Sequence, residues 1–116
     1  MSRAAQGLRA WLMQRITAIY LAIYLVSVLA YLALQSGLDY QAWHSWLASP
    51  AMGVLTALFM LALVLHVWVG VRDVLIDYIH AVGLRLLFMV VCGLVLLGSL
   101  LWVFRALALA ALQGSA

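Results

Sequence analysis

One histidine lies inside a long apolar stretch of this 116-residue chain. His66 stands in residues 51–71, a run of 21 residues in which Thr56 is the other polar interruption. In hydrocarbon, a ring N–H or lone pair without a partner is costly in free energy. We therefore expect His66 to hydrogen-bond to a Ser or Thr of a neighbouring helix, to bind a metal, or to relay protons.

Three further residues share one helix face with His66. Each residue of an α-helix turns by about 100°, so Gly70 lies about 40° from His66. Asp73 and Asp77 each lie about 20° from it by the same count. Gly70 has no side chain and leaves room for a flat macrocycle against the helix. A proton relay is less favoured, because the run holds no other ionisable residue.

A six-coordinate haem iron needs two axial ligands, and the chain has two further histidines. His44 and His80 both lie outside the apolar runs, near opposite surfaces. We expect neither of them to reach an iron that His66 binds. The lone cysteine, Cys92, cannot hold an iron–sulfur cluster, which usually needs four thiolates. The second ligand is therefore expected from another chain.

A second polar cluster, Asp77 and Tyr78, follows the apolar run. A Tyr hydroxyl can donate a hydrogen bond to a quinone carbonyl, and a nearby carboxylate can orient it. Tyr is also ordinary at a membrane interface, so both interpretations stay open. Arg15 stands just before the first apolar run. It could pair with Asp73, Asp77 or a haem propionate, or act only as a topogenic charge.

Membrane-spanning helices must position these residues. The chain is 70% hydrophobic and 8% charged, with no Lys or Glu, which cannot cover a soluble domain with polar surface. At 1.5 Å per residue, a run of 19 residues spans about 28 Å, close to the hydrocarbon thickness. The apolar runs are 16–34, 51–71 and 86–104. We expect an all-α membrane protein whose single anchor domain, 1–116, has transmembrane helices over approximately 15–36, 50–78 and 84–106.

Local signals mark the ends of these helices. Residues 35–37, Gln-Ser-Gly, are typical of a helix end, and the aromatic residues of 38–48 suit a membrane interface. Ser49 and Pro50 predict an N-cap followed by proline at the first helical position. Gly83 is expected to mark the turn before the third long helix. Three crossings place the two termini on opposite sides of the membrane.

The arginines predict the orientation. Five of the six stand in the N-terminal segment or between the second and third runs, and only Arg105 lies on the other side. The positive-inside rule therefore puts the N-terminus in the cytoplasm. No basic cluster with interleaved polar residues is present, so we expect membrane lipid and no nucleic acid as a contact.

The segment from His66 to Tyr78, HVWVGVRDVLIDY, resembles the signature of a known family. Its histidine, the glycine four residues on and the Asp-Tyr pair at eleven and twelve are similar to the hydrophobic membrane anchor subunit of bacterial succinate dehydrogenase, respiratory complex II. The RITAI sequence that starts at Arg15, the three-helix plan and the chain length extend the resemblance over nearly the whole chain.

The resemblance implies a role for each of these residues. His66 would be one axial ligand of haem b, and thus the iron ligand of this chain, with the other ligand from the cytochrome b anchor subunit. Tyr78 would hydrogen-bond the ubiquinone substrate, with Asp77 beside it. Arg15 would lie near the haem propionates or the quinone pocket.

The resemblance also implies partners and a location. The flavoprotein and iron–sulfur subunits would dock on the cytoplasmic face of the bacterial inner membrane and deliver electrons from succinate, an intermediate of the tricarboxylic acid cycle. This chain would then be a subunit of an oxidoreductase with no catalytic residue for succinate, one part of a heteromeric helical bundle.

Two alternatives stay open at this point. One is the haem-bearing anchor of another respiratory complex such as fumarate reductase, because the direction of electron flow depends on cofactors in other chains. The other is a small structural or transport subunit of the membrane. Transporters usually place an acidic residue at membrane depth, whereas all three Asp residues here lie at the ends of apolar runs.

Overall fold

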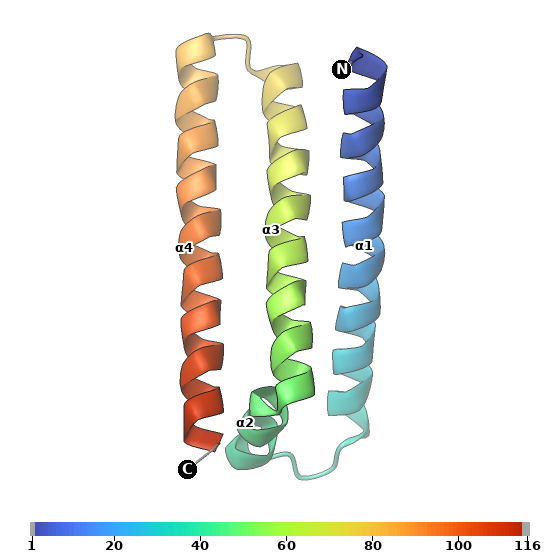
Figure 1. Cartoon of the computed structure of the whole chain (residues 1–116), viewed down its shortest axis with the longest axis vertical. Coiled ribbons are helices and arrows are strands. Elements are labelled where there is room, and N and C mark those ends of the chain that lie inside the picture. Colours follow the sequence, from blue (N-terminus) through green and yellow to red (C-terminus); the bar gives the residue numbers. More distant parts are fainter. Residues whose placement is uncertain (1, 115–116) are drawn as a thin grey trace.

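The computed structural model describes residues 2–114, and every regular element in this range is an α-helix. The helices are α1 (Arg3–Leu34), α2 (Tyr40–Ala48), α3 (Pro50–Tyr78) and α4 (Val82–Gly114). The three long helices run side by side with α3 between α1 and α4, and the short α2 lies at one end of the bundle (Figure 1). The expected all-α fold is confirmed. The N-terminal and C-terminal ends of the chain lie at opposite ends of the bundle, as three crossings require.

α1, α3 and α4 are each long and apolar enough to cross a membrane. The 32 residues of α1 extend over about 48 Å, more than a hydrocarbon core of about 30 Å. Among the described residues, only Thr17, Leu21 and Leu75 are buried. The large apolar side chains of α1 and α4 therefore face outward, where lipid or another chain must cover them. The protein is a multi-pass membrane protein.

α1 begins at Arg3, well before the expected start near residue 15. The hydroxyl of Ser2 accepts a hydrogen bond from the backbone N–H of Ala5 at 3.3 Å, which caps the helix. Ala, Leu, Arg and Gln dominate the residues that follow, and all of them favour helix. The first membrane-crossing helix thus carries an N-terminal extension with Arg3 and Arg9 on it.

The structure confirms that α1 ends just before Gln35-Ser36-Gly37 and that Ser49 is the N-cap of α3. α1 ends at Leu34, and Gly37 follows with a φ of +72°, a conformation that favours glycine. Ser49 is the N-cap of α3, with Pro50 at the first helical position. The Ser49 hydroxyl donates back to the Trp46 carbonyl at 2.7 Å and makes no cap hydrogen bond to α3.

Residues 38–48, expected only as an aromatic interfacial stretch, contain the helix α2. The carboxylate of Asp39 caps it by accepting from the backbone N–H of Ala42 at 2.8 Å. The rings of Trp46 and Tyr31 stack with centroids 4.0 Å apart and planes at 11°. This stack fixes α2 against the end of α1.

The expectation that Gly83 marks the turn before the last helix is wrong. Residues 79–81 make the turn, and the backbone N–H of Arg85 donates to the carbonyl of Ala81 at 2.9 Å, so Gly83 lies inside the first turn of α4. α4 also continues to Gly114, past the expected end near residue 106. Its tail is rich in Ala and Leu, the residues that favour helix most.

Two tyrosines of α1 fasten it to α3. The Tyr20 hydroxyl donates to the carbonyl of Leu55 at 2.7 Å, and the hydroxyls of Tyr24 and Thr56 lie 2.7 Å apart. The Tyr24 ring also stacks on Phe59 with centroids 4.4 Å apart. Hydrogen bonds between helices are one of the forces that hold membrane bundles together, because lipid offers no competing partners. These contacts fix the register of α1 on α3, and this register places the residues around His66.

Candidate functional site

His66 lies on the side of α3 that faces α1, and it is half-buried. Its Nδ1 atom is 3.1 Å from the Thr17 hydroxyl oxygen of α1. Thr17 is the most buried described residue, with 5% of its surface exposed. The hydrogen bond to a neighbouring helix that the sequence allowed is therefore present, and it engages one of the two ring nitrogens.

The level of His66 in the bundle follows from this contact. Thr17 is the second residue of the apolar run 16–34, about 3 Å along the axis from Arg15. Because His66 contacts Thr17, it lies level with the edge of the apolar run of α1. Its position within residues 51–71 alone would place it well inside the apolar run of α3. Thr17 and His66 both lie near the middle of their helices, and the groove beside them extends along α1 toward Arg3.

Gly70, one turn after His66, also faces α1. A Cβ atom built on Gly70 would lie 3.1 Å from the Nε2 atom of Gln14, closer than most real contacts. The Gln14 amide therefore occupies the space beside Gly70 in this chain. The sequence had suggested that this space is open to a flat macrocycle. The Oε1 atom of Gln14 is buried and has no hydrogen-bond partner among the described residues. Such an orphaned acceptor marks a site whose polar contacts are incomplete.

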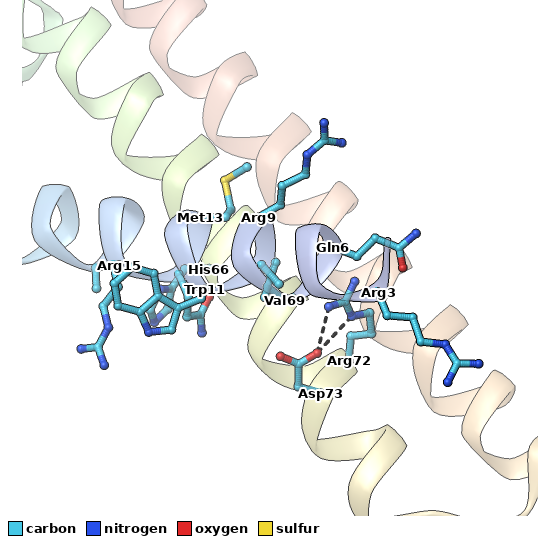
Figure 2. Close-up of a pocket in the computed structure, with 14 residues that line it drawn as sticks. Arg3, Gln6, Arg9, Trp11, Met13, Arg15, His66, Val69, Arg72 and Asp73 are labelled. Atoms are coloured by element: carbon cyan, nitrogen blue, oxygen red, sulfur yellow. Dashed lines mark hydrogen bonds and ion pairs between the residues drawn. The ribbon is translucent and has the colours of Figure 1, made fainter. Parts of the chain in front are cut away.

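A groove of about 950 Å³ opens between the N-terminal half of α1 and the C-terminal half of α3 (Figure 2). His66 lines it together with Gln14, Trp11 and Asp73. Four arginines also line it, namely Arg3, Arg9, Arg15 and Arg72. The groove therefore carries an excess of positive charge, which suits a ligand with carboxylate or phosphate groups.

The charges in the groove are only partly paired. Asp73 accepts from the Arg72 guanidinium at 2.9 Å, and both residues come from α3. Arg15 instead lies over the ring of Trp11, 5.5 Å from its centroid. Asp73 and Asp77 were the carboxylates suggested as partners of Arg15. Within residues 2–114, neither forms an ion pair with it. Figure 2 shows the guanidinium groups of Arg3, Arg9 and Arg15 pointing away from one another.

Asp77 and Tyr78 lie beyond the groove, in the last turn of α3. Tyr78 is 79% exposed and Asp77 is exposed as well. Of the two aspartates on the same face of α3 as His66, Asp73 lines the groove and Asp77 does not. Both residues remain open to another chain or a lipid-soluble ligand.

The other histidines lie far from His66. His44 is in α2, at the end of the bundle opposite the N-terminus, and His80 is in the turn between α3 and α4 at the other end (Figure 1). In the part of the chain that the structure describes, no group of three or more His, Cys, Asp or Glu side chains could hold a metal ion.

Sequence reasoning missed Gln14, Thr17 and Trp11 as parts of the site. A signal for the first two is present in the sequence. Gln14, Thr17, Tyr20 and Tyr24 recur at spacings of three and four, the pattern of one helix face. A polar stripe on a membrane helix points toward another helix, because lipid cannot satisfy it.

Comparison with known proteins identifies the family. The family model described as "Succinate dehydrogenase/Fumarate reductase transmembrane subunit" matches residues 1–101. The chain belongs to this family. A curated relative from Coxiella burnetii, "Succinate dehydrogenase hydrophobic membrane anchor subunit", is 30% identical over 102 residues, which cover 88% of this chain and 89% of the relative. The resemblance drawn from the His66–Tyr78 segment is thereby confirmed.

The protein is thus a membrane anchor subunit of the succinate dehydrogenase/fumarate reductase family. The matched residues include all of α1, α2 and α3 and more than half of α4. Both walls of the arginine-lined groove fall inside the matched range. An anchor subunit of this family associates with the catalytic subunits of its complex.

Proposed function

We propose that this chain is the anchor of a bacterial succinate dehydrogenase, in which His66 is one axial ligand of haem b. The proposal depends above all on the setting of His66. One ring nitrogen is held by Thr17 of the neighbouring helix, and the ring lines a groove rich in arginine. The name of the Coxiella burnetii relative favours succinate dehydrogenase over fumarate reductase as the enzyme.

The residues of the groove fit a haem. Neutral imidazole is a common axial ligand of haem iron, and His66 makes no hydrogen bond through Nε2 to any described residue. Within residues 2–114, no carboxylate forms an ion pair with Arg3, Arg9 or Arg15, so their charges are available to two propionates. The orphaned amide oxygen of Gln14 is consistent with a site that other groups complete. The second axial ligand would be a histidine of the cytochrome b anchor subunit.

Haem supplies one-electron transfer when it is bound. The residues of this chain would hold and orient it. His66 would bind the iron, and Thr17 and the α1–α3 contact would keep the ring from turning. The arginines would hold the carboxylates at the cytoplasmic end of the groove.

We further propose that Tyr78 and Asp77 form part of the ubiquinone site. The Tyr78 phenol would donate a hydrogen bond to a quinone carbonyl, and the Asp77 carboxylate beside it would orient the phenol or tune its acidity. Their exposure at the end of α3 suits a site completed by another subunit. Ubiquinone would then enter from the bilayer and leave as ubiquinol.

The proposed location is the bacterial inner membrane with the N-terminus in the cytoplasm. The N-terminus and the turn between α3 and α4 lie at one end of the bundle, and five of the six arginines belong to the segments that meet there (Figure 1). The iron–sulfur and flavoprotein subunits would dock at this end. The groove beside His66 would then lie toward the subunits that deliver electrons.

The test is the visible spectrum of the purified four-subunit complex. We expect a reduced b-type haem spectrum that His66→Ala weakens or removes. His44→Ala and His80→Ala serve as matched controls, because both histidines lie at the ends of the bundle, and they should leave the spectrum intact. A full spectrum in an assembled His66→Ala complex would rule out axial ligation by His66.

A further inference from the structure

We infer that Thr17 is a positioning residue that holds His66 in the tautomer with the proton on Nδ1 and presents the Nε2 lone pair as the ligand atom. The tautomer itself follows from contacts within this chain. Its effect on a bound haem rests on the proposed function. The two parts can be tested separately.

The inference starts from the proton of the Thr17 hydroxyl. Its oxygen lies 2.6 Å from the Met13 carbonyl, 3.2 Å from the Gln14 carbonyl and 3.1 Å from the Nδ1 atom of His66. A hydroxyl has one proton to donate and two lone pairs that accept. Carbonyl oxygens can only accept, so the short contact to Met13 takes the proton. The Thr17 oxygen is then left as an acceptor toward His66.

The ring must therefore donate through Nδ1. If Nδ1 carried the lone pair instead, it would face the lone pairs of the Thr17 oxygen across 3.1 Å. Thr17 is almost completely buried, so water has little access with which to relieve that repulsion. A neutral imidazole has one N–H, so placing it on Nδ1 leaves Nε2 as the lone-pair nitrogen. The helix contact thus selects the tautomer in which Nε2 can bind a metal.

The same hydrogen bond tunes the ligand. A partner on the far nitrogen of a metal-bound histidine fixes the ring orientation and raises its basicity. A more basic ligand stabilises ferric iron relative to ferrous iron and lowers the reduction potential. The Thr17 hydroxyl is a neutral acceptor strengthened by its own bond to Met13. Removing it should therefore raise the potential of the haem.

The first experiment uses Thr17→Val, which keeps the shape of the side chain and removes the hydroxyl. In the whole complex, we expect the ferric-to-ferrous ratio of the haem at a fixed potential to fall about fivefold. This corresponds to an upward shift of about 40 mV at 59 mV per tenfold change. Haem retention after detergent extraction should also fall, by about tenfold, as for other partners of metal-bound histidines. Thr17→Ser keeps the acceptor and should restore both values.

Thr56→Val is the matched control. Thr56 also makes a hydroxyl contact between α1 and α3, to Tyr24, about 15 Å along α3 from His66. Its loss should leave the haem potential unchanged. An equal shift in Thr56→Val, or no shift in Thr17→Val with full haem content, would overturn the tuning role of Thr17.

The tautomer is read without haem. Nitrogen-15 NMR of the histidine-labelled full chain in bilayers should show His66 protonated on Nδ1, with the signal assigned by its loss in His66→Gln. Thr17→Val should lose this preference. A proton on Nε2 in the parent chain would overturn the inference whatever the haem result. If the His66→Ala complex keeps its full haem spectrum while the parent chain is protonated on Nδ1, the proposed haem ligation is refuted and the tautomer assignment stands.

Discussion

The indole ring of Trp68 packs against the bare backbone of Gly93. A Cβ atom on Gly93 would lie 3.4 Å from the nearest ring atom of Trp68, at the lower limit of ordinary contact. Gly93 therefore lets α4 approach α3 at the level of the site, on the side of α3 away from α1. Small residues commonly serve this purpose in membrane helices.

Replacing Gly93 with leucine should push α4 away from α3. Overpacking of a close contact typically costs about 1–3 kcal/mol, so the thermal stability of the detergent-solubilised complex should fall. Gly98→Leu is the control, because nothing within residues 2–114 lies within 4 Å of a Cβ at that position. Equal losses in both variants would show that the Trp68 contact is not the cause.

Removing the Tyr78 hydroxyl should impair quinone reduction. Loss of one hydrogen bond of about 1 kcal/mol predicts a roughly fivefold rise in the apparent KM for ubiquinone in Tyr78→Phe. Succinate oxidation with an artificial electron acceptor should survive, since that reaction does not need the quinone site. Tyr40→Phe, an exposed tyrosine in α2 at the opposite end, should change neither activity. Parallel loss of both activities in Tyr78→Phe would indicate misassembly.

Arg15 and Arg105 form a natural pair for testing the groove charge. Each guanidinium lies over a tryptophan ring, 5.5 Å from Trp11 and 5.8 Å from Trp102, but only Arg15 lines the groove. A cation near the haem destabilises ferric iron, so Arg15→Gln should lower the haem potential, by roughly 40 mV for an interaction of roughly 1 kcal/mol. Arg105→Gln should leave it unchanged. A potential unaffected by Arg15→Gln would favour the purely topogenic role of this charge.

The Tyr24 hydroxyl should contribute modestly to stability. Hydrogen bonds between membrane helices average about 0.6 kcal/mol, so Tyr24→Phe should lower the unfolding free energy by roughly that amount. The ring stack on Phe59 should persist in this variant, because phenylalanine keeps the ring. Tyr24→Ala should cost clearly more. Similar losses in the two variants, measured in the same detergent titration, would assign the whole effect to the hydroxyl.

Topology reporters should place the two ends of the chain on opposite sides of the membrane. A reporter fused after Ala116 should be active outside the cytoplasm. A reporter inserted in the turn at residues 79–81 should be active inside it, because five arginines flank that side. A cytoplasmic signal from the C-terminal fusion would contradict the proposed orientation.

The pattern of apolar residues was sufficient to predict the three long helices. It did not reveal α2, whose nine residues are too few for periodicity to separate a helix from an interfacial loop. Gly83 was wrongly interpreted as a turn residue. It lies in the first turn of α4, where a Cβ would meet open space, so the space there does not require a glycine. α1 also begins at Arg3, capped by Ser2, well before the start expected near residue 15 from the apolar run.

The site was predicted only in part, for a physical reason. Helical spacing relates residues on one helix, so it linked His66 to Gly70 and Asp73. The contacts of His66 with Thr17, and of Gly70 with Gln14, depend on the register between α1 and α3. That register follows from interhelical contacts such as Tyr20 to Leu55, which no pattern within one helix encodes.

Within the described residues, the backbone of α4 packs against α3 and α2, and α3 lies between α4 and α1 (Figure 1). Both walls of the groove therefore come from the first 78 residues, and α4 reaches it only through α3. Substitutions in α4 should therefore affect the groove indirectly, through the position of α3. The turn at residues 79–81 therefore joins a helix that lines the groove to one that supports it from behind.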